Sequence, residues 1–269
     1  MKTSGNKEKK SIASVVKAIE IIEQIAESEA GLGVTEISQK LNLGVSSTYH
    51  ILNTLKSCNI VAQDRRTKKY QIGFGLFRIG TMAKGQNLLG NLAKPHLEYL
   101  SEELQETANL GMLNGTDMIC VAQAEGPHIF RIFTKIGVAS PFYFTAGGKL
   151  LVSLQAKERW ESLIRSIHLE KYTDHTIVNV SDLMRELEAT KARGYGVDNE
   201  EREEGVICIA APVYDMYGDA IAALSISGPT LRLKDKVRET AATLMKTADA
   251  FSRELGRAAE MTDLHGRAD

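Results

Sequence analysis

Residues 34–57 read VTEISQKLNLGVSSTYHILNTLKS. The stretch holds two helical patterns of apolar residues, separated by the tight-turn sequence Asn42-Leu43-Gly44. We expect the first helix to begin at Val34-Thr35, with Thr35 as its N-cap, because a threonine hydroxyl can accept a hydrogen bond from a free amide of the first turn. The second helix should run from near Val45 to about Ser57. Two short helices joined by a tight turn form a helix–turn–helix.

The segments on either side complete a small domain. Residues 11–28 carry apolar side chains at three- and four-residue steps, a pattern typical of an amphipathic helix. Beyond residue 57, two short β-prone runs at 60–62 and 70–72 flank a polar, basic turn, which predicts a hairpin. Helices followed by a basic hairpin favour a winged helix–turn–helix domain over residues 12–73.

This domain has suitable chemistry for binding double-stranded DNA. An α-helix fits the major groove, and the residues at its N-terminus face the base edges. Cations on the hairpin, or wing, would release counterions from the DNA backbone. The alternative interpretation of these residues is a set of helix caps and a solvated basic loop. The predicted DNA contacts are Thr35, Ser46, Ser47, Thr48, Tyr49, His50, Arg65, Arg66, Lys68 and Lys69.

Net charge is divided unevenly along the 269 residues. Residues 1–80 hold 12 Lys and Arg against 7 Asp and Glu, a net charge of +5, whereas residues 81–269 hold 21 against 27, a net charge of −6. A polyanion would therefore be attracted to the front of the chain and not to the remainder. The alternative is chance together with a solvated basic N-terminal tail, which supplies four of the twelve cations.

Composition argues against several classes of protein. Hydrophobic residues make up 43% of the chain and charged residues 25%, so a chain of this length can bury a core without disulfides. Cys58, Cys120 and Cys208 are far apart and have no C-x-x-C spacing, which argues against a disulfide framework or structural zinc and favours the cytoplasm. No apolar run approaches the ~18 residues of a membrane span, and the polar N-terminus has no secretory core. We expect no membrane partner.

The second half of the chain predicts a separate mixed domain, so that the fold class is α+β with two domains. A linker helix is expected over residues 74–92, with apolar faces that would supply part of a dimer interface, and the second domain over residues 93–257. Strands are expected at 107–114, 117–124, 129–134, 206–213 and 220–227, and helices at 147–155, 157–167, 181–193 and 234–259.

Several residues of the second domain suit a small polar ligand. Ala146-Gly147-Gly148 stands at a helix start, where backbone amides are free and small side chains allow an anion to approach closely. Ser225 and Ser227 share one face of a strand, and Cys208 lies in the middle of the strand before it. The alternatives are a tight helix entry for the glycines and a plain core cysteine.

Short motifs in both halves resemble one protein family. In the front half they are Ser46-Ser47-Thr48, Ile51-Leu52-x-Thr54-Leu55 and Tyr70-Gln71-Ile72-Gly73. In the second half they are Pro141 with Thr145-Ala146-Gly147-Gly148-Lys149, then residues 194–201, 205–213 and 222–229, with Arg232. In this order, the motifs resemble the IclR family of bacterial transcription regulators from residue 12 to about residue 257.

The resemblance implies a winged helix–turn–helix domain followed by a GAF-like domain that binds an effector. It implies a regulator, with repression favoured over activation, that binds a pseudo-palindromic operator as a homodimer or homotetramer. The expected effector is a small organic or aromatic acid. Two positions depart from the family pattern: His50, where arginine is frequent, and Lys68-Lys69, where glycine is common. By resemblance, the effector site is lined by Ala146, Gly147, Asp198, Cys208, Ser225 and Ser227.

Two other classes of function stay open on the sequence. An enzyme that used Cys208 as a nucleophile would need a neighbouring base, but no motif ties His128, His168 or His175 to this cysteine. Metal-ligand spacing of the H-x-x-x-H type is absent. We therefore expect no catalytic residue, no metal site and no cofactor. An architectural DNA binder without a ligand is the remaining class, and it predicts no thermal shift with any organic acid.

Overall fold

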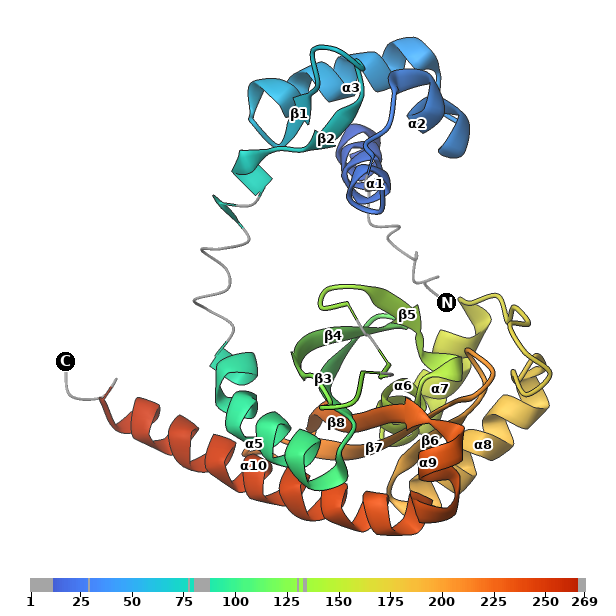
Figure 1. Ribbon diagram of the computed structural model, residues 1–269, viewed down its shortest axis with the longest axis vertical. Helices are drawn as coiled ribbons and strands as arrows, with labels where there is room; N and C mark the ends of the chain where they lie inside the picture. The colour runs from blue at the N-terminus through green and yellow to red at the C-terminus, as the bar shows by residue number, and fades with distance from the viewer. Residues whose placement is uncertain are drawn as a thin grey trace, which may run out of the picture. The chain divides into compact units, whose positions relative to one another are not determined.

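The computed structural model describes residues 12–28, 30–76, 78–79, 88–129, 131–132 and 135–265. The chain divides into two compact units, Met1–Asn87 and Leu88–Asp269. Each unit is described by itself below, with elements labelled as in Figure 1.

The first unit is the predicted winged helix–turn–helix. It contains α1 (Ala13–Ala26), α2 (Val34–Lys40), α3 (Val45–Ser57), β1 (Val61–Gln63) and β2 (Tyr70–Ile72). The two strands pair antiparallel as the wing hairpin. Leu32, between α1 and α2, adds a bridge to Tyr70 with backbone hydrogen bonds of 2.7 and 3.0 Å. The core joins all these elements through Ile21, Ile25, Leu32, Ile37, Leu52, Val61 and Tyr70.

The predicted N-cap of α2 is wrong by two residues. Gly33 is the N-cap, and Thr35 lies inside the first turn with its side chain exposed. The carboxylate of Glu36 accepts the Gly33 amide proton at 2.6 Å, so a side chain from the first turn of the helix binds the backbone amide of the N-cap residue. The threonine hydroxyl is therefore not needed as a cap.

The second unit is built on a six-stranded antiparallel sheet in the order β5-β4-β3-β8-β7-β6. The predicted strands at 107–114 and 117–124 are β3 and β4, and those at 206–213 and 220–227 are β7 and β8 to within two residues. The full strand bounds are β3 (Thr107–Asn114), β4 (Asp117–Ala124), β5 (Ala139–Pro141), β6 (Gly196–Asn199), β7 (Val206–Tyr214) and β8 (Ala220–Pro229).

Two strands differ from the sequence expectation. Of the predicted strand 129–134, residues 130, 133 and 134 lie outside the described residues, and 129, 131 and 132 are not in a strand. The partner of β4 is instead β5, which begins five residues later at Ala139. β6 was not anticipated, because its four residues include the polar pair Asp198-Asn199 and so lack an apolar run.

Helices cover both faces of this sheet (Figure 1). On one face, α5 (Leu88–Leu104) and α10 (Val237–His265) pack over β3, β7 and β8 and bury the largest apolar cluster, which includes Leu97, Leu224 and Phe251. On the other face, α6 (Ala146–Ser153) lies against β7 and β8, and α8 (Val180–Arg193) packs on α6. The shorter elements are η1 (Phe142–Phe144), α7 (Lys157–Arg165), α9 (Thr230–Leu233) and η2 (Lys234–Lys236).

The predicted linker falls largely on positions that are not described. Residues 77 and 80–87 lie outside the described residues, and 74–76 with 78–79 are helical. Residues 88–92 belong to α5, which packs on β3 and β4 of the second unit. The expected dimer contacts of residues 76–92 stay a prediction.

Candidate functional site

The exposed face of α3 carries most of the predicted base-reading residues. Ser46, Ser47, Tyr49 and His50 are all exposed in its first two turns, with half of Tyr49 accessible. Thr48 is the exception: its side chain is completely buried, and its hydroxyl donates to the Gly44 carbonyl at 3.1 Å. We therefore remove Thr48 from the predicted DNA contacts, because an interior side chain has no access to a groove.

The wing turn is shaped by Asp64. Its Oδ1 atom accepts hydrogen bonds from the amides of Arg66 and Thr67 and from the Thr67 hydroxyl, at 2.6–3.0 Å. These bonds, the backbone bond of Thr67 first, lower the pKa of Asp64. Lys68 adopts a φ of +59°, the left-handed conformation that glycine adopts most easily. At this position, where the family commonly has glycine, Lys68 therefore adopts a backbone conformation that is uncommon for residues with a side chain.

The wing presents a cationic surface. Arg65, Arg66 and Lys68 are exposed, and none of them forms an ion pair with a residue that the structure describes. Lys69 is half-buried and lies 3.9 Å from the carboxylate of Glu36. Three of the four predicted wing cations are thus available to a phosphate backbone.

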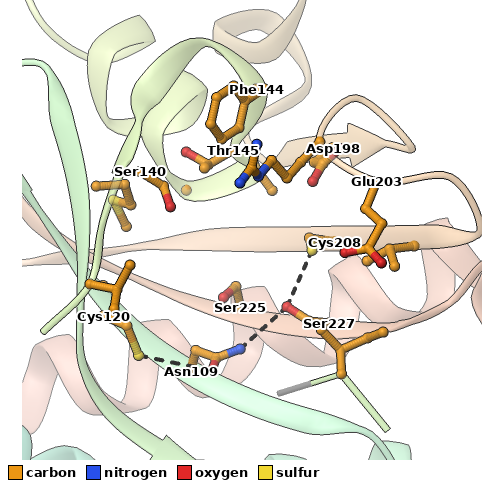
Figure 2. A pocket seen from close by; sticks show the side chains of 18 of the residues that line it. Asn109, Cys120, Ser140, Phe144, Thr145, Asp198, Glu203, Cys208, Ser225 and Ser227 are labelled. Atoms are coloured by element: carbon orange, nitrogen blue, oxygen red, sulfur yellow. Dashed lines mark hydrogen bonds between the residues drawn. The ribbon is translucent and has the colours of Figure 1, made fainter. Parts of the chain in front are cut away.

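The second unit contains a cavity of about 410 Å³ between the sheet and α6, a volume in the range of small-molecule sites. Figure 2 shows Asn109, Cys208, Ser225 and Ser227 along the sheet side and Phe144, Thr145 and Asp198 opposite them. All six residues predicted for the effector site line this one cavity: Ala146, Gly147, Asp198, Cys208, Ser225 and Ser227.

The N-terminus of α6 forms one wall. Thr145 is the N-cap, and its hydroxyl oxygen accepts the Gly148 amide proton at 3.1 Å. The amides of Ala146 and Gly147 precede any intrahelical acceptor and carry the positive end of the helix dipole. A Cβ on Gly148 would lie 2.6 Å from the Cα of Phe142, so glycine is needed there for close packing. The wall offers two backbone donors to an anion.

A ladder of polar side chains crosses the sheet floor. The Cys208 thiol and the Asn109 amide both donate to the Ser227 hydroxyl oxygen, at 3.2 and 3.3 Å (Figure 2). Asn109 Oδ1 in turn accepts from Gln123 Nε2 at 2.9 Å and lies 4.0 Å from Cys120 Sγ. Four neighbouring strands are thereby connected through side chains beneath the cavity.

Buried charge lies behind the cavity wall. Lys149 is completely buried and forms ion pairs with Glu201 and, at 3.6 Å, with Glu186. Glu186 also pairs with Arg193 at 2.7 Å. Burial raises the pKa of Glu201 despite the lysine; at Glu186 the same burial effect is outweighed by the two cations, which lower its pKa.

Asp198 connects this charge cluster to the cavity. It is 5% exposed, lines the cavity, and accepts the Glu201 amide proton at 2.8 Å. Burial and then the neighbouring Glu201 carboxylate raise the pKa of Asp198 to about 7. This carboxyl group can therefore accept or donate a hydrogen bond to a ligand near neutral pH.

Sequence reasoning missed several residues of the cavity. Asn109 is one of them: it lies directly opposite Ser225 in the register of β3 and β8, a pairing that the sequence does not show. Lys135 and Arg202 also line the cavity, and neither forms an ion pair with any described residue. Arg202 instead packs over the rings of Tyr172 and Phe144, at 4.3 and 5.3 Å from the centroids. In the sequence, Arg202 lies within an acidic stretch, and this position does not indicate that the residue lines a cavity.

The chemistry of Cys208 does not suit a nucleophile. Burial first, and then the Asp198 carboxylate, raise the pKa of its thiol far above the neutral range, and a thiol is weakly nucleophilic. His128, His168 and His175 do not line the cavity. Across the described ranges, no group of three or more His, Cys, Asp and Glu side chains is placed to hold a metal ion. The same ranges contain no helix that is long and apolar enough to span a membrane.

Comparison with known proteins identifies the family. Residues 14–65 match the IclR helix-turn-helix domain, and residues 82–253 match the bacterial transcriptional regulator IclR C-terminal domain. The chain belongs to the IclR family of transcriptional regulators. The fold class and the winged helix–turn–helix predicted from the sequence are thereby confirmed, and the protein is a DNA-binding regulator with an effector-binding C-terminal domain rather than an enzyme.

Relatives of known role cover nearly the whole chain. The transcriptional regulator KdgR of Escherichia coli is 33% identical over 252 residues, 93% of this chain and 95% of its own length. The transcriptional repressor AllR of the same species is 31% identical over 248 residues, 92% of both chains. The crystal structure of Thermotoga maritima IclR is 29% identical, with a TM-score of 0.68 over 91% of this chain and all of that one.

Proposed function

We propose that this IclR-family regulator is a cytoplasmic repressor, and that a small organic or aromatic acid in the cavity of the second unit controls its affinity for a pseudo-palindromic operator. The observation that carries the proposal is the convergence of helix amides and polar side chains on one cavity. A repressor is favoured because the relative AllR is one. A homodimer or homotetramer is favoured because a two-fold operator needs paired DNA-binding domains.

DNA contacts are proposed for residues of α2, α3 and the wing that are exposed or, in the case of Lys69, partly exposed. The α3 residues would read base edges in the major groove, and the wing cations would contact phosphates. His50 stands where the family frequently has arginine, and an imidazole makes fewer hydrogen bonds than a guanidinium. The proposed set is Thr35, Ser46, Ser47, Tyr49, His50, Arg65, Arg66, Lys68 and Lys69.

The ligand's carboxylate is proposed to bind the amides of Ala146 and Gly147. A helix N-terminus is a ready anion site, and the cavity places it opposite the polar sheet floor. Lys135 and Arg202 add positive charge around the same cavity, which further favours an acid over a neutral ligand.

Effector and operator are proposed to be coupled through the dimer. Effector binding would repack the second unit and change the spacing of the paired DNA-binding domains, which would shift operator affinity. Linkage then requires operator DNA to change effector affinity by the same factor. Equal effector affinity with and without operator would exclude this equilibrium mechanism.

The test is a mobility-shift assay on the DNA upstream of the gene, repeated with a panel of small organic and aromatic acids. We expect binding to one duplex and its release or tightening by a subset of acids. Ser47→Ala and His50→Ala should change sequence preference, whereas Glu23→Gln, exposed on α1, serves as the control. Absence of binding to any duplex by the assembled protein in dilute buffer would overturn the proposal.

A further inference from the structure

The outward face of α3 continues past His50 into the next turn of the helix. Thr48 and Leu52 are completely buried and mark the side of α3 that faces the core. At about 100° per residue, His50 lies about 160° around the helix from each of them, so it points away from the core. Asn53 lies about 60° from His50 on the same scale, and it is exposed. The surface of the proposed base-reading residues therefore includes Asn53.

The other outward side chains in this half of α3 are already hydrogen-bonded to the helix. The Thr54 hydroxyl donates to the His50 carbonyl at 3.0 Å, and the Ser57 hydroxyl donates to the Thr54 carbonyl at 2.8 Å. Each hydroxyl has thereby given its only hydrogen to the backbone. The carboxamide of Asn53 forms no hydrogen bond with any residue in the described ranges. Of these three side chains, only Asn53 keeps both a donor and an acceptor for an external partner.

A side-chain bridge holds the wing beside this part of the helix. Gln63, the last residue of β1, accepts a hydrogen bond from Lys56 Nζ at 3.2 Å and donates from Nε2 to the Lys68 carbonyl at 3.0 Å. Lys56 lies about 60° further around α3 than Asn53, on the side away from His50. Asn53 is thus between His50 and the side of α3 that is bonded to the wing. A duplex that contacts His50 and the wing tip together therefore also lies over Asn53.

A free carboxamide is complementary to one base in the major groove. Adenine presents its N7 acceptor next to its N6 amino donor, and the N–H and C=O groups of an asparagine pair with the two together. Guanine presents two acceptors at this edge, and cytosine and thymine present one polar group each. A carboxamide is also neutral, so a contact with phosphate would release no counterion. The chemistry of Asn53 therefore favours a base contact, with adenine as the base.

We propose that Asn53 is a specificity-determining residue of the operator contact, and that its carboxamide binds the N7 and N6 groups of one adenine in each half-site. The proposal rests on the proposed function, because it assumes that α3 lies in the major groove. It adds one base of the half-site to that function. Asn53 is about 4.5 Å along the helix axis from His50, and stacked bases are about 3.4 Å apart, so the adenine lies within one or two base pairs of the base that His50 contacts.

The first test selects binding sites from a pool of randomised DNA duplexes with the full-length protein. We expect the unmodified protein to select one adenine per half-site for which Asn53→Ala has no preference, while the preferences at the other positions are kept. The variant should fold, because Asn53 is exposed and alanine is the better helix former.

Two further variants sharpen the selection. Asn53→Asp keeps the shape and the acceptor but has no N–H donor, so it should also lose the preference for adenine. Gln24→Ala is the matched control, because it removes a carboxamide from α1, where this group is hydrogen-bonded to Glu27 at 3.2 Å. It should select the same sites as the unmodified protein.

A substitution in the DNA tests the same contact without a change in the protein. 7-Deazaadenine lacks the N7 acceptor and keeps the Watson–Crick pair. Placed at the selected adenine in both half-sites, it should weaken binding of the unmodified protein about tenfold and leave the dissociation constant of Asn53→Ala unchanged. Fluorescence anisotropy at one fixed salt concentration measures both. Equal weakening of the two proteins would overturn the inference.

The outcomes distinguish this inference from the proposed function. The inference is wrong, and base reading by α3 stands, if Ser47→Ala or His50→Ala changes the selected sites but Asn53→Ala does not. It is also wrong if Asn53→Ala weakens binding to all duplexes alike, which is the effect of a phosphate contact, or if the lost preference is for a base other than adenine. If the unmodified protein selects no duplex, the inference is overturned together with the proposed function.

Discussion

The ammonium group of Lys149 forms an ion pair with the carboxylate of Glu201 in the interior of the second unit, where the two residues are 0% and 6% exposed. Lys149 extends from the first turn of α6, and Glu201 follows β6, so the pair joins the helix at the cavity wall to the strand that carries Asp198. One oxygen of Glu201, Oε2, is buried without a hydrogen-bond partner. The pair is therefore held by charge more than by a complete set of hydrogen bonds.

Removal of the lysine should destabilise the second unit strongly. In Lys149→Met, Glu201 would be left as a buried carboxylate without its cation, at a cost of about 3–5 kcal/mol. Chemical denaturation followed by tryptophan fluorescence measures this, since Trp160 is buried in the same unit. The double variant Lys149→Met/Glu201→Gln should recover part of the loss.

The control for this prediction is Lys157→Ala. Lys157 pairs with Glu188 at 2.7 Å, but both side chains are more than half exposed, and such pairs contribute little. We expect its denaturation midpoint to match that of the unmodified protein. Equal effects of the two lysine substitutions would contradict the buried-charge argument.

Stability should also depend on pH through Asp198. Its pKa is raised from an ordinary 3.8 to about 7 in the folded protein, first by burial. Between these two values the unfolded chain loses the proton while the folded protein keeps it, so the free energy of unfolding decreases as the pH rises from about 4 to about 7. The steepest slope from one such group is about 1.4 kcal/mol per pH unit. The raised pKa of Glu201 acts in the same direction.

Asp198→Asn should flatten this decrease, because an amide does not titrate. Asp249→Asn, on the exposed face of α10 and paired with Arg253, should leave it unchanged. Denaturation midpoints at five pH values between about 3.5 and 8, which lie on both sides of this window, provide the measurement. If the stability of Asp198→Asn decreased with pH at the same slope, titratable groups other than Asp198 would be responsible for the pH dependence.

The fold was accessible from sequence where local patterns were strong. The Asn114-Gly115 turn fixed the hairpin of β3 and β4 to the residue, since Gly115 adopts a φ of +61° that suits glycine. The start of α6 was predicted to within one residue from the small residues Ala146, Gly147 and Gly148. Both signals lie within a few neighbouring positions and need no knowledge of tertiary contacts.

Residues that depend on tertiary pairing were missed. Asn109 enters the site because β3 and β8, more than 100 residues apart in sequence, are neighbours in the sheet. Thr48 was misassigned because α3 turns this one hydroxyl inward to the Gly44 carbonyl. Lys149 was noted as part of a motif, but its burial depends on Glu186 and Glu201, which come from a helix and a loop distant in sequence.

Gly147 should be needed for ligand binding more than for stability. A Cβ there would lie 2.6 Å from the terminal methyl of Met118, which can move, and 3.3 Å from Ala223 Cβ. In Gly147→Ala the displaced methionine and the new methyl would cover the donor amide, so we expect at least tenfold weaker binding of any acid that binds the cavity, with a small change in Tm.

Gly148→Ala is the informative comparison. Its Cβ would lie 2.6–2.8 Å from backbone atoms of Phe142, which cannot move aside as a methionine end can. We expect this variant to lose stability by about 1–3 kcal/mol. Differential scanning fluorimetry with and without acid separates the two effects. Unchanged acid affinity in Gly147→Ala would place the carboxylate elsewhere in the cavity.

The wing cations should determine how strongly salt weakens DNA binding. Arg65 and Arg66 are exposed and form no ion pair with the residues described in the structure, so their replacement by alanine should leave the fold intact. If each contacts one phosphate, the double variant Arg65→Ala/Arg66→Ala reduces the slope of log affinity against log salt by about 2, and weakens binding to all sequences alike. Fluorescence anisotropy with an operator and a scrambled duplex at four salt concentrations gives both quantities.

The control is the double variant Arg165→Ala/Arg185→Ala, which replaces two exposed arginines of the second unit. It changes the net charge equally and should not alter the slope. If both double variants reduced the slope equally, the overall charge of the protein would account for the salt dependence, and the wing would not contact the DNA.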